Sequence, residues 1–295
     1  MGLKTKKFHQ MFAAEHHKMQ QKNIILNSLK ESFSLIWRNK SLFALLLALQ
    51  IAFFAAFSII SYNYVPKMVE SQKAIEEYMS NLKFDDVSVA ANIQQQKSIL
   101  GEDPLLISRN FNEIVKNFRL YLIYIFLLLV FFISTGWAIT NRLVYKMNFR
   151  ALTKNFLKNL VVSLIYLGLI FLFFFSLLTI PLSGVAAESS RLLAKYVPFF
   201  AFSIILAYFM LISISLLHNT GFKNVVQKTL IIGIKKAHYI LAVYFLNFFL
   251  FAVSIALFYY FIEKNLFILS MSITLMLFSL VFGRIFMVKA VEKLD

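Results

Sequence analysis

Six stretches of roughly 20 or more mostly apolar residues dominate the sequence and leave few ways for the chain to fold. They cover 41–64, 120–140, 160–182, 198–217, 239–261 and 266–288. A helix needs roughly 20 apolar residues to cross about 30 Å of hydrocarbon, and inside lipid its backbone polar groups must be satisfied within the segment. The sequence therefore predicts an all-α, polytopic membrane protein with six transmembrane helices.

Charged side chains are nearly absent from these stretches. The first five contain no Asp, Glu, Lys or Arg, each of which costs about 2.5–3.5 kcal/mol at the centre of an inserted helix. The sixth contains Arg284 near its end, where a long side chain can reach the headgroups. We therefore expect no ionisable group deep in the membrane, which argues against a proton-coupled pump.

Basic residues fall mainly on one side of the predicted membrane. The first 40 residues, the 142–159 and 218–238 loops and the tail from 284 together carry twenty Lys and Arg but only four acids, whereas the other side carries ten of each. Short loops rich in Lys and Arg stay in the cytoplasm. The +16 net charge is thus interpreted as a topology signal rather than a nucleic-acid site. It predicts a cell-membrane protein with cytoplasmic amino and carboxyl termini.

The predicted organisation has three parts. A basic cytoplasmic segment covers 1–40, a six-helix transmembrane domain covers 41–288, and a cytoplasmic tail covers 289–295. The one sizeable soluble segment is the outer loop 65–119, which is expected to be helical over 66–82 and 105–118. Either the spans extend beyond the bilayer here, which we favour, or the loop is a docking site for a partner.

Three amphipathic stretches, 25–40, 142–159 and 222–238, each lead into an odd-numbered span. Basic residues recur every four positions in the second one, at Arg142, Lys146, Arg150, Lys154 and Lys158. Helices with one basic and one apolar face lie at the membrane interface. These five side chains are therefore candidate contacts for anionic lipid headgroups. The pattern also predicts a unit used three times, made of an interfacial helix, a span, an outer turn and a span.

No enzymatic motif is evident. The chain lacks a P-loop, an H-E-x-x-H helix, a G-x-S-x-G turn and a dinucleotide-binding glycine pattern, and it has no cysteine. We expect no enzyme activity, cofactor or metal. The deepest polar side chains are Gln50 in the first span and Asn247 in the fifth. They are candidate intramembrane contacts, either to a substrate or, as is commoner for such amides, to another helix.

Two segments carry a resemblance. The run from Ser28 to Lys40, S-L-K-E-S-F-S-L-I-W-R-N-K, resembles the entry to the first span in a group of uncharacterised prokaryotic six-helix membrane proteins. That group includes the membrane domain attached to some glycerophosphoryl diester phosphodiesterases. The G-F-K-N-V-V run from Gly221 to Val226 is similar to a later repeat of the group. The resemblance implies the six-helix fold. The long outer loop departs from the group, and no phosphodiesterase domain is present in this sequence, so no catalytic residue is carried over.

Two functions fit these observations. The first is a non-enzymatic assembly or lipid-contacting protein, whose partners are anionic headgroups on the cytoplasmic side and a membrane protein or a second copy of the chain. The alternative is a permease or exporter component for an apolar or amphiphilic solute. A polar cavity around Gln50 and Asn247 would favour transport, and a packed bundle would favour the first function.

Overall fold

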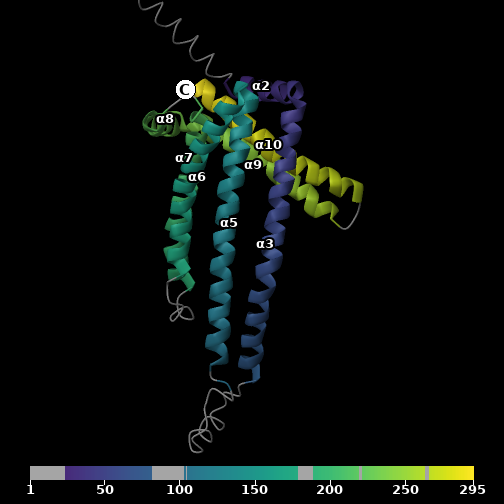
Figure 1. Ribbon diagram of the computed structural model, residues 1–295, viewed down its shortest axis with the longest axis vertical. Helices are drawn as coiled ribbons and strands as arrows, with labels where there is room; N and C mark the ends of the chain where they lie inside the picture. The colour runs from purple at the N-terminus through teal and green to yellow at the C-terminus, as the bar shows by residue number, and fades with distance from the viewer. Residues whose placement is uncertain (1–23, 82–102, 104, 179–188, 219–220, 263–265) are drawn as a thin grey trace, which may run out of the picture. The chain divides into compact units, whose positions relative to one another are not determined.

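Every regular element that the computed structural model describes is a helix. The described residues are 24–81, 103, 105–178, 189–218, 221–262 and 266–295. The helices are α2 (Ile24–Arg38), α3 (Lys40–Asn81), α5 (Leu106–Tyr145), α6 (Phe149–Leu178), α7 (Ser189–Leu216), α8 (Phe222–Lys235), α9 (Ala237–Phe261) and α10 (Leu266–Leu294) (Figure 1). Among these described helices, six are long and apolar enough to cross a membrane. The predicted all-α architecture with six spans is therefore confirmed.

The chain divides into two compact units. One unit, 52–129, consists of the larger part of α3 and the first part of α5. Within it the two helices are joined by the Ser61 and Tyr121 hydroxyl oxygens, which lie 3.3 Å apart, and by the rings of Tyr64 and Tyr124, whose centroids lie 5.7 Å apart. Both stretches that were expected to be helical in the outer loop continue the flanking spans, and the loop residues 82–102 between them lie outside the described residues.

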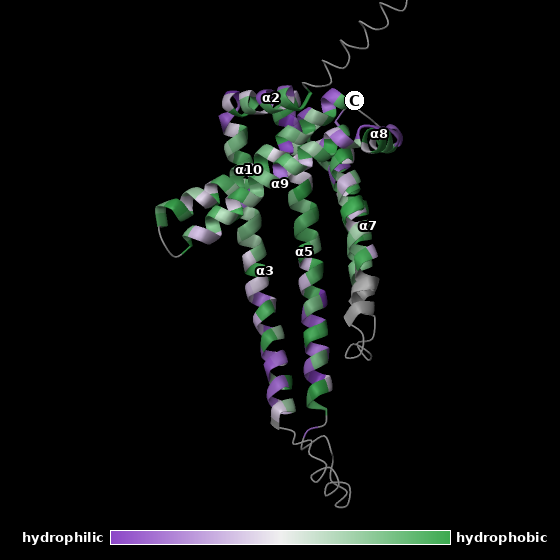
Figure 2. Ribbon diagram, turned by 180° about the vertical axis from the view of Figure 1, so that it is seen from behind, coloured by the Kyte–Doolittle hydropathy of each residue, from purple (hydrophilic) through white to green (hydrophobic). Residues whose placement is uncertain are grey.

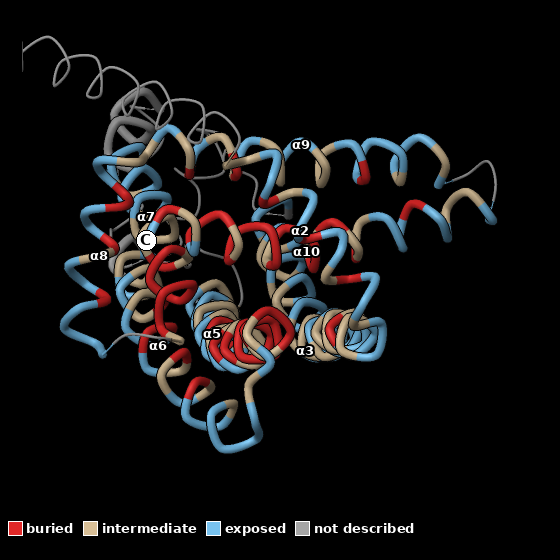
Figure 3. Tube along the Cα trace, turned by 90° about the horizontal axis from the view of Figure 1, so that it is seen from above, coloured by how far each residue is buried: buried red, intermediate tan, exposed pale blue. Residues whose placement is uncertain are grey.

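The other unit, 1–51 and 130–295, is built around the second half of α10. This helix packs against α2, α7 and α9. Val281, Phe282, Ile285, Phe286 and Val288 are all fully buried, and Figure 3 shows the buried positions of α10 gathered in this half. The outer part of the α9–α10 hairpin is mostly exposed and apolar (Figure 2), as expected for a surface that lipid covers.

The short helices α2 and α8 both form ion pairs with the carboxyl end of the chain, and α8 packs mainly against α7. Glu31 of α2 accepts a hydrogen bond from Lys293 at 2.7 Å, and Phe33 packs on Phe282 with ring centroids 4.7 Å apart. Lys228 of α8 pairs with Asp295 at 2.6 Å. Exposed ion pairs add at most about 1 kcal/mol each. The packing of Phe33 on Phe282 therefore contributes more to the stability of the α2–α10 contact than the ion pair does.

The second amphipathic stretch does not form a helix of its own, unlike the other two. The predicted 142–159 segment is divided between the end of α5 and the start of α6. Lys146 at the break has φ 51°, a left-handed conformation that ends a helix. Asn148 then accepts a hydrogen bond from the N–H of Ala151 at 2.9 Å, which caps α6. The predicted threefold unit therefore lacks a separate amphipathic helix before its second pair of spans. Residues 1–23 of the amino-terminal segment lie outside the described residues.

Candidate functional site

A guanidinium group lies among polar side chains within the helical bundle. Arg284 is ten residues before the end of α10, and Gln50 is ten residues after the start of α3, so each lies about 15 Å along its helix from that end at 1.5 Å per residue. The Nη2 of Arg284 donates a hydrogen bond to Oε1 of Gln50 at 3.1 Å. Arg284 therefore turns toward another helix, whereas the sequence predicted a side chain that reaches the headgroups.

Gly136 of α5 makes room for this guanidinium. A Cβ atom built on Gly136 would overlap the Nη1 atom of Arg284 and would come within 3.7 Å of Leu49. Thr140, one turn further along α5, is fully buried and donates a hydrogen bond to the carbonyl oxygen of Gly136 at 2.7 Å. The absence of a side chain at position 136 thus lets the cation from α10 lie against the backbone of α5.

Asn247 of α9 borders the same turn of α10. Its Nδ2 donates a hydrogen bond to the carbonyl oxygen of Gly283 at 3.3 Å. A Cβ on Gly283 would lie 3.1 Å from Cγ of Asn247, so the absence of a side chain permits this approach. The Oδ1 of Asn247 is enclosed by protein and has no hydrogen-bond partner among the described residues. The two candidate amides, Gln50 and Asn247, therefore contact adjacent residues of α10.

No carboxylate neutralises Arg284 within the part of the chain that the structure describes. The ion pairs there involve Lys or Arg side chains elsewhere on the surface. A guanidinium has five N–H donors and stays charged, yet its one hydrogen bond here goes to a neutral amide. An intramembrane cation is costly and is normally paired. The arrangement can accept an anionic group, since the guanidinium fork matches phosphate and carboxylate oxygens.

The five basic candidates around the α5–α6 break do not share one environment. Lys146, Arg150 and Lys154 are exposed, as expected for side chains that face headgroups. Lys158 is partly buried and donates a hydrogen bond to the carbonyl oxygen of Leu217 at 3.0 Å, where it stabilises the carboxyl end of α7. Arg142, in the last turn of α5, is also partly buried.

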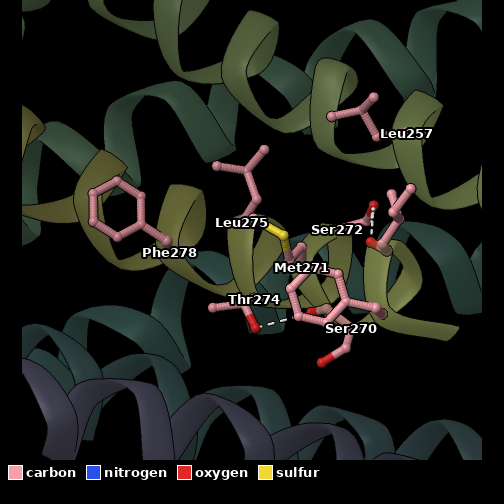
Figure 4. Close-up of a pocket in the computed structure, with 9 residues that line it drawn as sticks. Leu257, Ser270, Met271, Ser272, Thr274, Leu275 and Phe278 are labelled. Atoms are coloured by element: carbon pink, nitrogen blue, oxygen red, sulfur yellow. Dashed lines mark hydrogen bonds between the residues drawn. The ribbon is translucent and has the colours of Figure 1, made fainter.

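A separate groove of about 580 Å³ lies on the α9–α10 hairpin. Figure 4 shows Leu257, Met271, Leu275 and Phe278 around it. The hydroxyls of Ser272 and Thr274 donate to backbone carbonyls of their own helix, at 2.9 Å in both cases. The groove is therefore a mainly apolar surface of the kind that hydrocarbon chains fill. Phe278 and Arg284 are six residues apart and so lie on different faces of α10.

The fold and this site together define a multi-pass α-helical membrane protein that carries a cation inside its last span. No family model matches the chain, and no curated protein or solved structure is significantly similar to it.

Sequence reasoning missed the contact between Arg284 and Gln50 and the space that Gly136 leaves for it. A lone Arg near the end of an apolar stretch is usually a boundary residue, and nothing in the sequence near Gln50 or Gly136 indicates which helix each one faces. One sequence feature indicates that Arg284 lies inside the span: the apolar run continues beyond it through Ile285, Phe286, Met287 and Val288.

Proposed function

We propose that the protein is a non-enzymatic membrane protein that binds an anionic amphiphile, with Arg284 contacting its phosphate or carboxylate. The observation that carries this proposal is the Arg284–Gln50 hydrogen bond of 3.1 Å, in which a permanent cation has a neutral partner. An anion would supply the missing charge and accept several of the remaining N–H donors. Charge-assisted hydrogen bonds of this kind are worth about 1.5–3 kcal/mol each.

The depth of the site favours an amphiphile over a soluble ion. Arg284 and Gln50 lie about 15 Å along their helices from one end, in a unit whose outer surface is largely apolar. The neighbouring amphipathic helices and the exposed Lys146, Arg150 and Lys154 would concentrate anionic headgroups at that end, by about 1 kcal/mol per basic residue near the surface. The excess of basic charge there supports the proposal that this end, with both termini, is cytoplasmic.

Lipid that copurifies with the protein tests the proposal. Native mass spectrometry of the full chain in mild detergent, after incubation with phosphatidylglycerol or with phosphatidylcholine, measures the fraction that retains each lipid. We expect wild type to retain phosphatidylglycerol preferentially and Arg284→Gln to lose that preference. Arg284→Lys should keep part of it, because a Lys retains the charge without the planar fork.

Arg119→Gln is the matched control. It removes the same charge from an exposed position on α5, far along the helix from the α5–α6 break, and should leave the preference unchanged. If Arg119→Gln and Arg284→Gln weaken retention of phosphatidylglycerol equally, the lipid responds to the overall charge of the protein and the proposed site is wrong.

A further inference from the structure

A second polar cluster lies where α5 ends, α6 begins and α7 ends. Among the described residues, eleven buried side-chain nitrogen and oxygen atoms lack a hydrogen-bond partner. Nine of them belong to six residues of this region, namely Asn141, Tyr145, Asn155, Asn159, Ser163 and His218. Such a concentration needs a physical reason, because most buried polar groups in folded proteins are satisfied.

The cluster is deeply enclosed. Asn141, Asn159 and Ser163 are fully buried, and Asn155 is 3% exposed. Each orphaned buried polar group costs about 1–3 kcal/mol, whereas a whole domain is stable by about 5–15 kcal/mol. The four side chains together therefore represent a large cost unless water or a ligand hydrogen-bonds them.

The members of the cluster on α6 lie on one face of that helix. Asn155, Asn159 and Ser163 recur every four residues on α6 and share a face with Tyr166, whose hydroxyl lies 3.2 Å from Oγ of Ser213 on α7. This face of α6 is therefore turned to α7.

The members of the cluster on α5 approach the end of α7. Asn141 and Tyr145 are one turn apart on α5. The ring of Tyr145 stacks on His218, just beyond α7, with centroids 3.4 Å apart and an interplanar angle of 11°. Asn141 is also one position past Thr140, so it faces about 100° away from the Arg284 side of α5. The cluster and the Arg284 site are thus separate.

The side chains of the cluster are uncharged, although the carboxylates of Glu292 and Asp295 act on His218 at its edge. Three carboxamides and two hydroxyls each offer both donors and acceptors, and Nε2 of His218 adds one more group. Lys158, which precedes Asn159 on α6, donates to the carbonyl oxygen of Leu217 at 3.0 Å. A ligand that matches this set carries several neighbouring hydroxyls and no charge.

We propose that the Asn141–Asn155–Asn159–Ser163 cluster binds a polyhydroxylated, uncharged group, such as a sugar or polyol, either as a lipid headgroup or as a free molecule.

Thermal unfolding of the full chain in phosphatidylcholine nanodiscs tests the proposal with two probes, monoglucosyl diacylglycerol in the bilayer and methyl glucoside in solution. We expect at least one probe to raise the Tm of wild type by about 2 °C or more, because a ligand that binds only the folded state stabilises it. A rise with the lipid alone identifies a headgroup, and a rise with methyl glucoside identifies a free sugar.

Asn159→Leu removes two orphaned atoms at nearly constant volume, and Asn63→Leu is the control, since Asn63 is exposed and bonded within its own helix. We expect Asn159→Leu to unfold at or above the wild-type Tm without ligand and to lose the response to the probe, while Asn63→Leu keeps it. A Tm several degrees below wild type would mean that the amides pair with one another, which overturns the proposal. The proposal is also overturned if neither probe raises the Tm of the wild-type protein. That result does not depend on whether the variant folds.

Discussion

Arg284 of α10 donates a hydrogen bond to Gln50 of α3, a residue 234 positions away in the sequence and 3.1 Å away in the structure. The pair joins the first and last spans through a cation and a neutral amide. Gly136 of α5 provides the space beside it. This hydrogen bond is the basis of the proposed function. Substitutions at Gln50 and Gly136 test separately the charge and the space that the site requires.

Gln50→Glu should replace the proposed ligand with a built-in carboxylate. An Arg–carboxylate pair is stronger than the existing bond to a neutral amide, so we expect the lipid-free variant to unfold at a higher temperature than wild type. The same variant should bind phosphatidylglycerol at least about tenfold more weakly, which corresponds to about 1.4 kcal/mol. Thermal unfolding and lipid titration of the purified protein measure both. A variant that is less stable and still binds phosphatidylglycerol would show that Arg284 is already neutralised.

Gly136→Ala should displace the guanidinium of Arg284. The new Cβ would overlap its Nη1 atom, but the far end of a long side chain can move, so we expect the stability to change by no more than about 1 kcal/mol. The selectivity for anionic lipid should fall. Gly168→Ala on α6 is the control, because a Cβ there meets nothing within 4 Å. It should stabilise α6 by about 0.5–1 kcal/mol and leave lipid selectivity intact.

Sequence reasoning identified the spans because insertion into lipid imposes a strong local rule. An uncharged apolar run such as 239–261 forms α9, Ala237–Phe261, within a few residues. The sequence also indicated Gln50 and Asn247 as candidate intramembrane contacts. Both side chains form hydrogen bonds with α10. What these amides contact depends on helix order and rotation, which no local pattern encodes.

The 142–159 stretch illustrates a different limit. Its four-residue spacing of basic side chains predicts one continuous helix. The same spacing continues across the point where α5 ends and α6 begins. The left-handed conformation of Lys146 and the cap from Asn148 divide the stretch. The buried amides at Asn155 and Asn159 belong to the same stretch. They were overlooked because the basic face beside them is the more obvious feature.

Acidification should destabilise the protein partly through His218. Burial lowers the pKa of His218 from its ordinary value of 6.5, and Lys158 adds to this, while the Ser215 carbonyl, Glu292 and Asp295 oppose it. Its ring also stacks on Tyr145. The unfolded chain therefore binds a proton on this residue at a higher pH than the folded chain does, so the stability from neutral His218 is present above pH 6.5 and is lost as the pH falls below it.

His218→Gln checks this prediction. We expect the Tm difference between pH 7.5 and pH 5.5 to be smaller in the variant than in wild type, measured in the same detergent. An equal difference in the two proteins would assign the pH dependence to other groups.

Single cysteines should report the proposed topology cleanly, because the chain has no cysteine of its own. Thr153→Cys and Gln72→Cys each place a thiol at an exposed position, the first near the α5–α6 break and the second on the outer part of α3. We expect a membrane-impermeant maleimide to label Gln72→Cys in intact cells and Thr153→Cys only after lysis. The reverse pattern would place both termini outside the cytoplasm.

The most direct test of the proposed anion site is a titration followed by the fluorescence of Trp137. This indole is 3% exposed and lies next to Gly136, whereas Trp37, the other of the two tryptophans, is 75% exposed. In Trp37→Phe protein, titrated with short-chain phosphatidylglycerol or phosphatidylcholine, we predict a saturable change in emission with the anionic lipid alone. Adding Arg284→Gln should weaken that response at least about tenfold, or about 1.4 kcal/mol, whereas adding Arg119→Gln should not. An equal response to both lipids, or an unchanged affinity in the Arg284→Gln protein, would contradict the proposal.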